Sequence, residues 1–317
     1  MDLVPELIVD SQDYIGESPA WDATERRLLW TDKLPGVVHE ARPDGAGAWR
    51  ETGRWDLGRV ISAVIPRAGG GLLIASETEL LSLDKDGELT PFASVDARGV
   101  EVRLNDGKCD ARGRLWAGTL DTDIAVAGRP VTPGRCALYR IDPNGSAEIV
   151  LDGLTLSNGL DWSPDGRIFY HIDTAARRID AFDFDMDAGA IANRRTIVQL
   201  SAEDGGLPDG LCVDAEGCLW VAMVGRSEVW RYAANGERLG RVRVASEVTS
   251  CAFGGPDGSD LFITTARARL PDAILRNGFT HGVDMRKAVD SGITPGNGGL
   301  YRVRPGVGGP PARPFGG

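Results

Sequence analysis

Histidines, basic tracts and long apolar runs are scarce or missing in this chain, and each shortage argues against a class of protein. Only 3 of the 317 residues are histidine and no G-x-S-x-G motif occurs, so a Ser-His-Asp triad has little material. The 46 acidic residues outnumber the 35 basic ones, and the formal net charge of -11 argues against nucleic acid or an anionic membrane as partner. No apolar run reaches the roughly 18 residues that a membrane-spanning helix needs.

Paired cysteines and a leader sequence are missing as well. The chain has 5 cysteines, an odd number, with no C-x-x-C pair, and four of them lie in apolar runs, so we expect reduced thiols in the core. They are Cys109, Cys136, Cys212, Cys218 and Cys251. The first ten residues, MDLVPELIVD, have neither a positively charged region nor a long apolar stretch, so we expect no signal peptide. These features predict a soluble, cytoplasmic protein.

Glycine, by contrast, is abundant. The chain has 42 glycines, about 13% of its residues, against a usual value of about 7%. Many stand in Asp-Gly, Asn-Gly and Gly-Gly pairs along the whole chain. This distribution is typical of many short strands joined by tight turns.

One sequence unit recurs six times: an apolar strand, a turn with Asp and Gly, and a second apolar strand. The first aliphatic residues of the second strands are Leu28, Leu72, Leu115, Ile168, Leu219 and Leu261. A third strand and, in most units, a visible fourth strand follow, and four strands at a period of about 45 residues indicate a β-propeller blade. The sequence therefore predicts an all-β, six-bladed β-propeller with four antiparallel strands per blade, in a single domain over residues 1–317. A two-domain α/β fold fits less well, because only residues 272–289 suggest a helical stripe.

Two segments lie outside the repeat. Glu6–Asp10 resembles the segment that precedes another blade, so we expect it to supply the outer strand of the last blade and to close the ring. Residues after Leu300 are rich in Gly and Pro and are poor material for a further strand. Residues 271–299 form an insertion in the last blade, which could be a lid or contact loop or a solvated excursion.

Oxygen-bearing side chains occupy the same position in all six units. Ten residues before each aligned aliphatic residue, or eleven in the last unit, stand Ser18, Ser62, Asn105, Asn158, Asp209 and Ser250. Equivalent positions of a propeller lie at one height around its central axis, so these side chains should meet at the mouth of the channel. Glu17, Asn158 and Asp209 would then bring two carboxylates and one amide together, which suits a hard divalent cation. Ca²⁺, Mg²⁺, Mn²⁺ and Zn²⁺ all remain open, and Asn or Asp before Gly can also simply cap a turn.

Several short motifs, in this order, resemble the senescence-marker-protein/gluconolactonase/regucalcin family of six-bladed propellers. The resemblance covers about residues 5–305. Its motifs are GESP from Gly16, RLNDGK from Arg103, GRLWAGT from Gly113, SNGL from Ser157 with SPDG from Ser163, and PDG from Pro208.

The resemblance implies a metal-dependent hydrolase that opens an aldonolactone, a sugar lactone, to its acid. Glu17, Asn158 and Asp209 would bind one catalytic divalent metal, and Arg103 and Asn105 would hold the hydroxyl groups of the substrate. Asp123 matches a further substrate-contacting acid of the family by its spacing from Arg103, although family members commonly have glutamate there. The chemistry is consistent, because a metal polarises an ester carbonyl and activates water, and Asp209 could accept the proton of that water.

Two other functions fit the same residues. One is hydrolysis of another ester or a phosphotriester, which a pocket lined by apolar side chains would favour. The other is a non-enzymatic propeller that binds calcium or a protein partner. Arg103 could also form a surface ion pair. We expect His171 to be structural, and Trp30, Trp116 and Trp220 to pack between blades.

Overall fold

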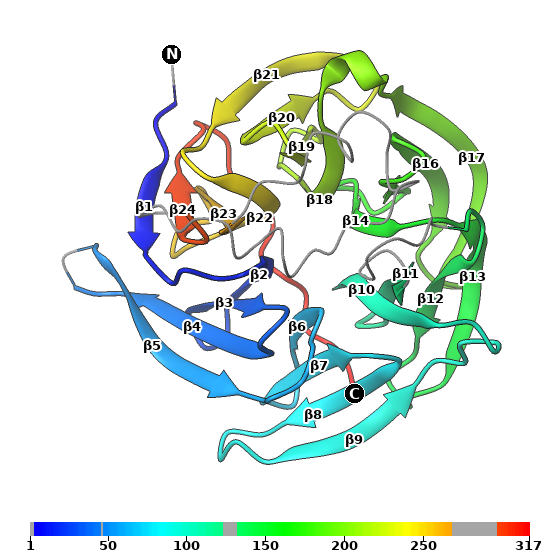
Figure 1. Cartoon of the computed structure of the whole chain (residues 1–317), viewed down its shortest axis with the longest axis horizontal. Helices are drawn as coiled ribbons and strands as arrows, with labels where there is room; N and C mark the ends of the chain where they lie inside the picture. Colours follow the sequence, from blue (N-terminus) through cyan, green and yellow to red (C-terminus); the bar gives the residue numbers. More distant parts are fainter. Residues whose placement is uncertain (1–2, 46, 123–131, 268–296) are drawn as a thin grey trace.

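Six four-stranded antiparallel sheets are arranged in a ring around a central axis, so the predicted all-β six-bladed propeller is confirmed (Figure 1). The computed structural model describes the chain except residues 1–2, 46, 123–131 and 268–296. In five blades the strands follow one another in the sequence from the axis outward. The last blade does the same for its inner three strands, but its outer strand, β1, comes from the N-terminal end of the sequence. No α-helix occurs in the described residues.

The strands follow the predicted order. The first three blades contain β2 (Gly16–Asp22), β3 (Arg27–Asp32), β4 (Val37–Pro43) and β5 (Trp49–Asp56); β6 (Ala63–Pro66), β7 (Leu72–Ser76), β8 (Glu79–Leu83) and β9 (Leu89–Ser94); and β10 (Val102–Cys109), β11 (Leu115–Asp121), β12 (Cys136–Ile141) and β13 (Ala147–Leu154). The last three contain β14 (Ser157–Trp162), β15 (Ile168–Asp173), β16 (Arg178–Asp185) and β17 (Ala190–Gln199); β18 (Leu207–Val213), β19 (Leu219–Val224), β20 (Glu228–Tyr232) and β21 (Arg238–Arg243); and β22 (Glu247–Gly254), β23 (Asp260–Ala266), β24 (Leu300–Val303) and β1 (Glu6–Val9).

The core lies between neighbouring blades. Apolar side chains of the inner strands are fully buried there, whereas outer strands such as β17 and β21 expose most of their residues. Trp30, Trp116 and Trp220 are at most 3% exposed, so their predicted role in packing is confirmed. The indole nitrogens of Trp116 and Trp220 each donate to a buried carboxylate, of Asp110 and Asp214, which satisfies the polar end of each ring.

The N-terminal strand closes the ring as predicted. β1 pairs antiparallel with β24, with Glu6 opposite Arg302 and Leu7 opposite Tyr301. The Arg302 guanidinium also donates to the Glu6 carboxylate at 2.6 Å. The last sheet therefore combines strands from both ends of the sequence, and β1 covers the edge that β24 would otherwise leave unpaired.

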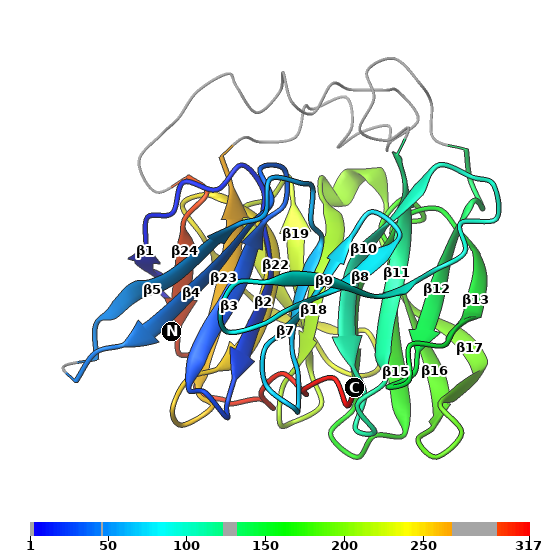
Figure 2. The ribbon, with the colours of Figure 1, turned by 90° about the horizontal axis from the view of Figure 1, so that it is seen from below.

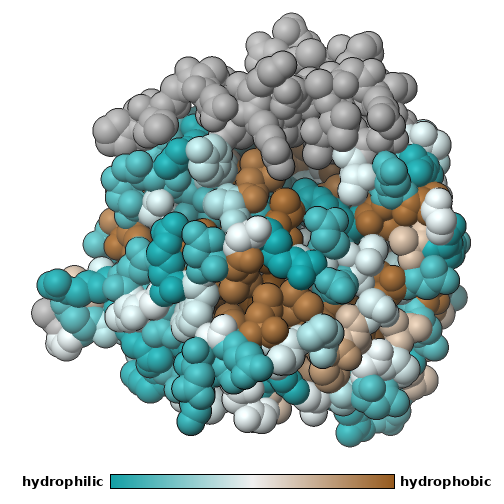
Figure 3. All heavy atoms as spheres, turned by 60° about the horizontal axis from the view of Figure 1, so that its bottom comes forward, coloured by the Kyte–Doolittle hydropathy of each residue, from teal (hydrophilic) through white to brown (hydrophobic). Residues whose placement is uncertain are grey.

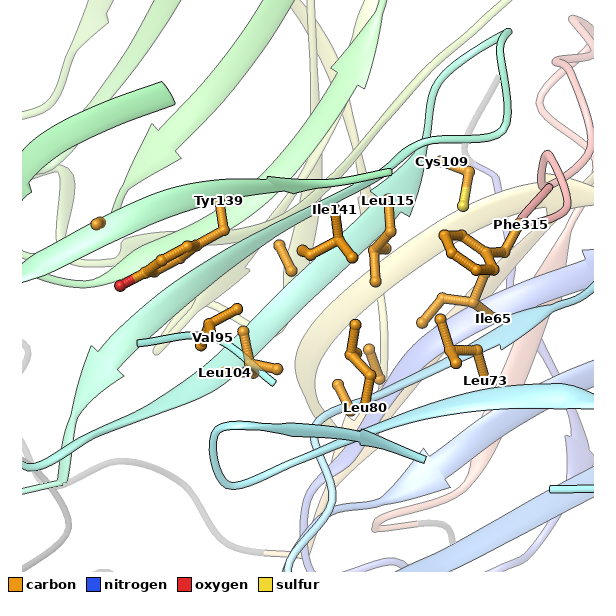
Figure 4. Packing of buried hydrophobic residues seen from close by; sticks show 14 residues of the cluster. Ile65, Leu73, Leu80, Val95, Leu104, Cys109, Leu115, Tyr139, Ile141 and Phe315 are labelled. Atoms are coloured by element: carbon orange, nitrogen blue, oxygen red, sulfur yellow. The ribbon is translucent and has the colours of Figure 1, made fainter. Parts of the chain in front are cut away.

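The C-terminal tail forms no strand but crosses the end of the propeller opposite the start of the inner strands (Figure 2). Its Phe315 is fully buried and points toward Ile65, Leu73 and Cys109 between the second and third blades (Figure 4). The Phe315 backbone donates to Pro66 and accepts from Ala68, each at 2.8 Å. The tail thus joins two blades that are far from it in sequence.

The outer surface is mainly polar. Figure 3 shows one face on which hydrophilic residues predominate and hydrophobic residues gather toward the middle. Among the described residues no helix is long and apolar enough to cross a membrane. The predicted insertion at residues 271–299 lies, up to residue 296, outside the described residues.

Candidate functional site

A β-bulge interrupts the inner strand of five blades at the level where the sequence predicted the channel mouth. In four of them two residues oppose a single residue of the second strand, and in the last blade one extra residue is inserted. The bulged residues are Ser18–Pro19, Asn105–Asp106, Asn158–Gly159, Asp209–Gly210 and Thr249. A bulge turns a side chain away from the regular alternation of the strand, and bulges are frequent beside active sites. In the last blade the bulge falls at Thr249, one residue before the expected Ser250.

Small residues allow these bulges to approach one another. A Cβ atom on Gly159 would lie 2.5 Å from the carbonyl oxygen of Asp209 and from the nitrogen of Leu211. A Cβ atom on Gly210 would lie 2.5 Å from Cα of Ser250. The Asn-Gly and Asp-Gly pairs that the sequence offered as turn caps therefore serve to bring neighbouring inner strands into contact around the axis.

A chain of hydrogen bonds links three of the bulged blades. The Asn105 Nδ2 group donates to Asn158 Oδ1 at 2.7 Å and to the carbonyl of Ser157 at 2.8 Å. Asn158 in turn donates through Nδ2 to Thr174 Oγ1 at 2.8 Å. Thr174 donates to the carbonyl of Pro208, next to Asp209, at 2.7 Å. Both amides are thereby fixed in orientation, because each has a hydrogen-bond partner at its donor end and at its acceptor end.

Two acids lie in the same region. Burial raises the pKa of Glu17, and the charge of nearby Asp106 raises it further against the opposing effect of Lys33. Burial raises the pKa of Asp209 well above its ordinary value, and the charge of Glu17 is the next cause. The charge of Glu17 thus destabilises the ionised form of Asp209. An all-oxygen set of two such carboxylates and the Asn158 amide fits a hard divalent cation, which would favour both ionised forms.

Lys33 is a member of this site that sequence reasoning missed. Its Nζ donates to Asn105 Oδ1 at 2.7 Å and lies 3.6 Å from Glu17 Oε1. Lys33 directly follows strand β3, which pairs with the strand that contains Glu17, and it is only 6% exposed. The repeat could not reveal it, because the register argument examined inner strands alone, but a lysine at the channel end of a second strand was a usable signal.

Arg103 lies at the same end of the channel. Burial lowers its pKa, while the charges of Glu77 and Glu17 act in the opposite direction. Its Nη1 atom is buried and has no hydrogen-bond partner. A buried guanidinium with an unused donor is costly in a folded chain, and a substrate oxygen would satisfy it. The alternative of an Arg103 surface ion pair receives no support from this geometry.

The remaining predicted residue cannot be placed. Asp123 lies outside the described residues. Asp121, two residues earlier, is fully buried and its Oδ2 lies 2.9 Å from Arg135 Nη1, so this acid has a partner within its own blade. The predicted substrate contact of Asp123 stays a prediction.

Two other groups of chemistry-bearing side chains have structural roles. Burial lowers the pKa of His171 to about 3, and its Nε2 lies 2.7 Å from Ser157 Oγ, with neither residue exposed. This pair matches the expectation of a structural histidine. Asp214, Glu216 and Cys218 form an acidic cluster, but Arg231 lies within 2.7 Å of both acids and supplies the counter-charge.

A cavity of about 60 Å³ lies along the channel beside the bulges. Ser18, Asp106 and Ser250 line it on one side and Pro310–Arg313 of the tail on another. Lys108 also lines it, where its ammonium lies 3.0 Å from Asp161. The tail residues therefore border the axial space opposite the candidate site.

The fold and the site together define a class of protein: six-bladed propellers with oxygen-bearing side chains gathered at one end of the central channel. Within this class, residues 15–267 match the family model described as SMP-30/gluconolactonase/LRE-like region, and the chain belongs to that family. The predicted resemblance is thus confirmed.

Individual proteins are similar to this chain in sequence or in structure. The chain is 37% identical to regucalcin of Danio rerio over 264 residues, which are 82% of this chain and 86% of the relative. A luciferin-regenerating enzyme is similar in structure with a TM-score of 0.82 and 28% identity, over 99% of both chains. A calcium-binding protein, regucalcin, from Agrobacterium tumefaciens has a TM-score of 0.81 and 26% identity, over 99% of this chain and 98% of that one.

Proposed function

We propose that this protein is a divalent-metal-dependent hydrolase that opens a sugar lactone, an aldonolactone, to its acid. The observation that carries the proposal is the combination, at one end of the channel, of two acids with raised pKa values, Glu17 and Asp209, and the unused donor of Arg103. The name of the family, which includes gluconolactonase, supports the reaction class.

The residues divide into three roles. Glu17, Asn158 and Asp209 would hold one metal, which would polarise the lactone carbonyl and lower the pKa of a bound water. Arg103 would donate to a substrate oxygen through Nη1, and Asn105 would keep Asn158 in place through the 2.7 Å hydrogen bond between them. Asp209 would accept a proton from the attacking water, because desolvation and the charge of Glu17 raise its pKa and make it a stronger base. Asp123 is proposed as a further contact to the sugar.

The direct test measures acid release from a panel of aldonolactones at constant pH. The protein is first treated with chelator and then assayed with Ca²⁺, Mn²⁺, Mg²⁺ or Zn²⁺ added back singly. We expect turnover of at least one aldonolactone only after a metal is restored. Turnover that persists in chelator, or no turnover of any lactone with any metal, would contradict the proposal.

A second candidate function is hydrolysis of a different ester on the same residues. It is favoured by the likeness to the luciferin-regenerating enzyme, whose name describes an activity other than lactone hydrolysis. Adding aryl esters and a phosphotriester to the same panel separates the two, since preference for an uncharged aryl substrate would select the second candidate. Metal binding in the absence of any hydrolysis would instead support a calcium-binding role, as the name of the Agrobacterium tumefaciens relative suggests for that protein.

A further inference from the structure

We propose that Lys33 is a positioning residue of this site, whose buried ammonium orients Asn105 and opposes the binding of the divalent cation, so that Lys33 sets the affinity for the metal. The inference rests on the proposed metal site and adds a residue that the ligand set does not include.

The hydrogen bonds of Lys33 support the first half of the proposal. Its Nζ donates at 2.7 Å to the Oδ1 atom of Asn105, which leaves the Nδ2 group of that amide directed at Asn158 Oδ1, also at 2.7 Å. An amide has one acceptor end and one donor end. Because the ammonium occupies the acceptor end, Lys33 determines which end of Asn105 faces the proposed ligand Asn158.

The charge of Lys33 supports the second half. The ammonium lies 3.6 Å from the Oε1 atom of Glu17, a proposed ligand, and the side chain of Lys33 is only 8% exposed. A divalent cation bound to Glu17 would therefore have a positive charge a few ångströms away in a site with little solvent to screen it. Like charges at such a distance in a buried site repel strongly.

Hydrogen bonds of the backbone hold Lys33 close to the proposed metal site. Its nitrogen donates to the carbonyl of Ile15 at 3.0 Å, and its carbonyl accepts from Ile61 at 3.1 Å. The Cα atom is thus held between the first and second blades, and only the side chain can change its direction.

The composition of the chain also sets Lys33 apart. The sequence contains 31 arginines but only four lysines, at positions 33, 85, 108 and 287. The surface ion pairs are made by arginine in the described residues, whereas Lys33 and Lys108 both face the channel region. An ammonium differs from a guanidinium there by being a compact point charge on a flexible stem.

The experiment titrates metal into the chelator-treated, full-length protein by calorimetry, with CaCl₂ and MnCl₂ as probes. It compares wild type, Lys33→Met, Lys33→Arg and a matched control, Lys85→Met, which removes an exposed lysine far from the channel. We expect Lys33→Met to lower the Kd by at least about tenfold, because a neighbouring positive charge is gone. Lys33→Arg keeps the positive charge, so its Kd should stay close to that of wild type. The Kd of Lys85→Met should equal that of wild type.

Further variants make the result specific. Asp209→Asn should abolish binding both alone and together with Lys33→Met, which identifies the titrated site. Lys33→Gln replaces Lys33→Met if melting curves in chelator show that the methionine variant is unfolded.

Two results would overturn the inference and are distinguishable. An unchanged or weaker affinity in Lys33→Met, with wild type binding metal, would refute the role of Lys33 alone. A failure of every variant, wild type included, to bind either metal would refute the metal site as well.

Discussion

At the scale of single residues, Glu17 and Asp209 place function and stability in opposition. Glu17 is buried and Asp209 half-buried at the channel mouth. Desolvation raises the pKa of each, the charge of Asp106 raises that of Glu17 further, and the charge of Glu17 raises that of Asp209 further. Such a pair costs free energy in the folded protein unless a cation compensates it. A site of this kind is held in place by the surrounding fold, since the two acids themselves favour separation.

The opposition predicts the behaviour of Asp209→Asn. In chelator we expect this variant to melt several degrees above wild type, because it removes one of two repelling acids and keeps the shape of the side chain. Its metal-supported turnover should fall by about a hundredfold or more. Calorimetric melting and the lactone assay measure the two effects. A variant that keeps near-native turnover would contradict the role of Asp209, and Asp257→Asn on the exposed surface provides the control.

The identity of most site residues followed from the sequence, because one rule of register located Asn105, Asn158 and Asp209 together. Lys33 and Glu77 did not follow from it. Glu77 acts on Arg103 from the turn between β7 and β8, with a φ of 52°, and its carbonyl accepts from Leu104 at 2.7 Å. Such partners come from turns, where no repeat fixes the position of a side chain.

At the scale of elements, the first blade contains a charge network around the buried His39 that is separate from the channel. His39, on β4, lies 3.1 Å from Asp13 through Nε2 and 2.8 Å from Glu51 through Nδ1. Trp30 stacks on its ring with centroids 4.8 Å apart. Burial by itself lowers the pKa of His39, but the hydrogen bonds and charges of both acids outweigh it and the pKa is raised.

This network predicts a pH-dependent stability. A histidine whose pKa is higher in the folded state stabilises the protein fully below its unfolded pKa of about 6.5, and this contribution is lost as pH rises through the folded value. We therefore expect the free energy of unfolding of wild type to exceed that of His39→Gln most at pH 6 and least at pH 9. Urea titrations across this range measure the difference. A gap that widens with rising pH would contradict the assignment.

The strands themselves were predictable from alternating apolar residues and glycine-rich turns, and the closing strand β1 from its likeness to another segment. The bulges were not. An extra residue at Ser18 or Asn158 leaves the apolar pattern on both sides intact, so only the paired strand reveals it. The sequence alignment located the oxygen-bearing residues that the bulges contain, but it did not predict the bulges themselves.

At the scale of the whole molecule, the C-terminal tail is a structural component of the ring. Its Gly- and Pro-rich sequence has no periodicity, so the sequence predicted the absence of a strand but not the burial of Phe315. The aromatic ring packs among apolar residues of the second and third blades, edge-on to Phe92 with centroids 5.4 Å apart.

Phe315→Ala should therefore destabilise the protein although the residue lies in a tail that forms no strand. Truncating a buried phenylalanine costs about 3–5 kcal/mol through lost burial and the cavity left behind. Chemical denaturation measures the loss. Val4→Ala, at a residue that is 83% exposed near the other terminus, should leave stability unchanged. Equal midpoints for wild type and Phe315→Ala would show that the tail is dispensable.

The pairing of β1 with β24 has a consequence for biosynthesis. Glu6 precedes its partner Arg302 by 296 residues in the sequence. Throughout translation the nascent molecule therefore presents a strand with no complement, a state that invites association with other chains. Closure of the ring is therefore a contact between segments far apart in the sequence, and such long-range strand pairing is intrinsically slow.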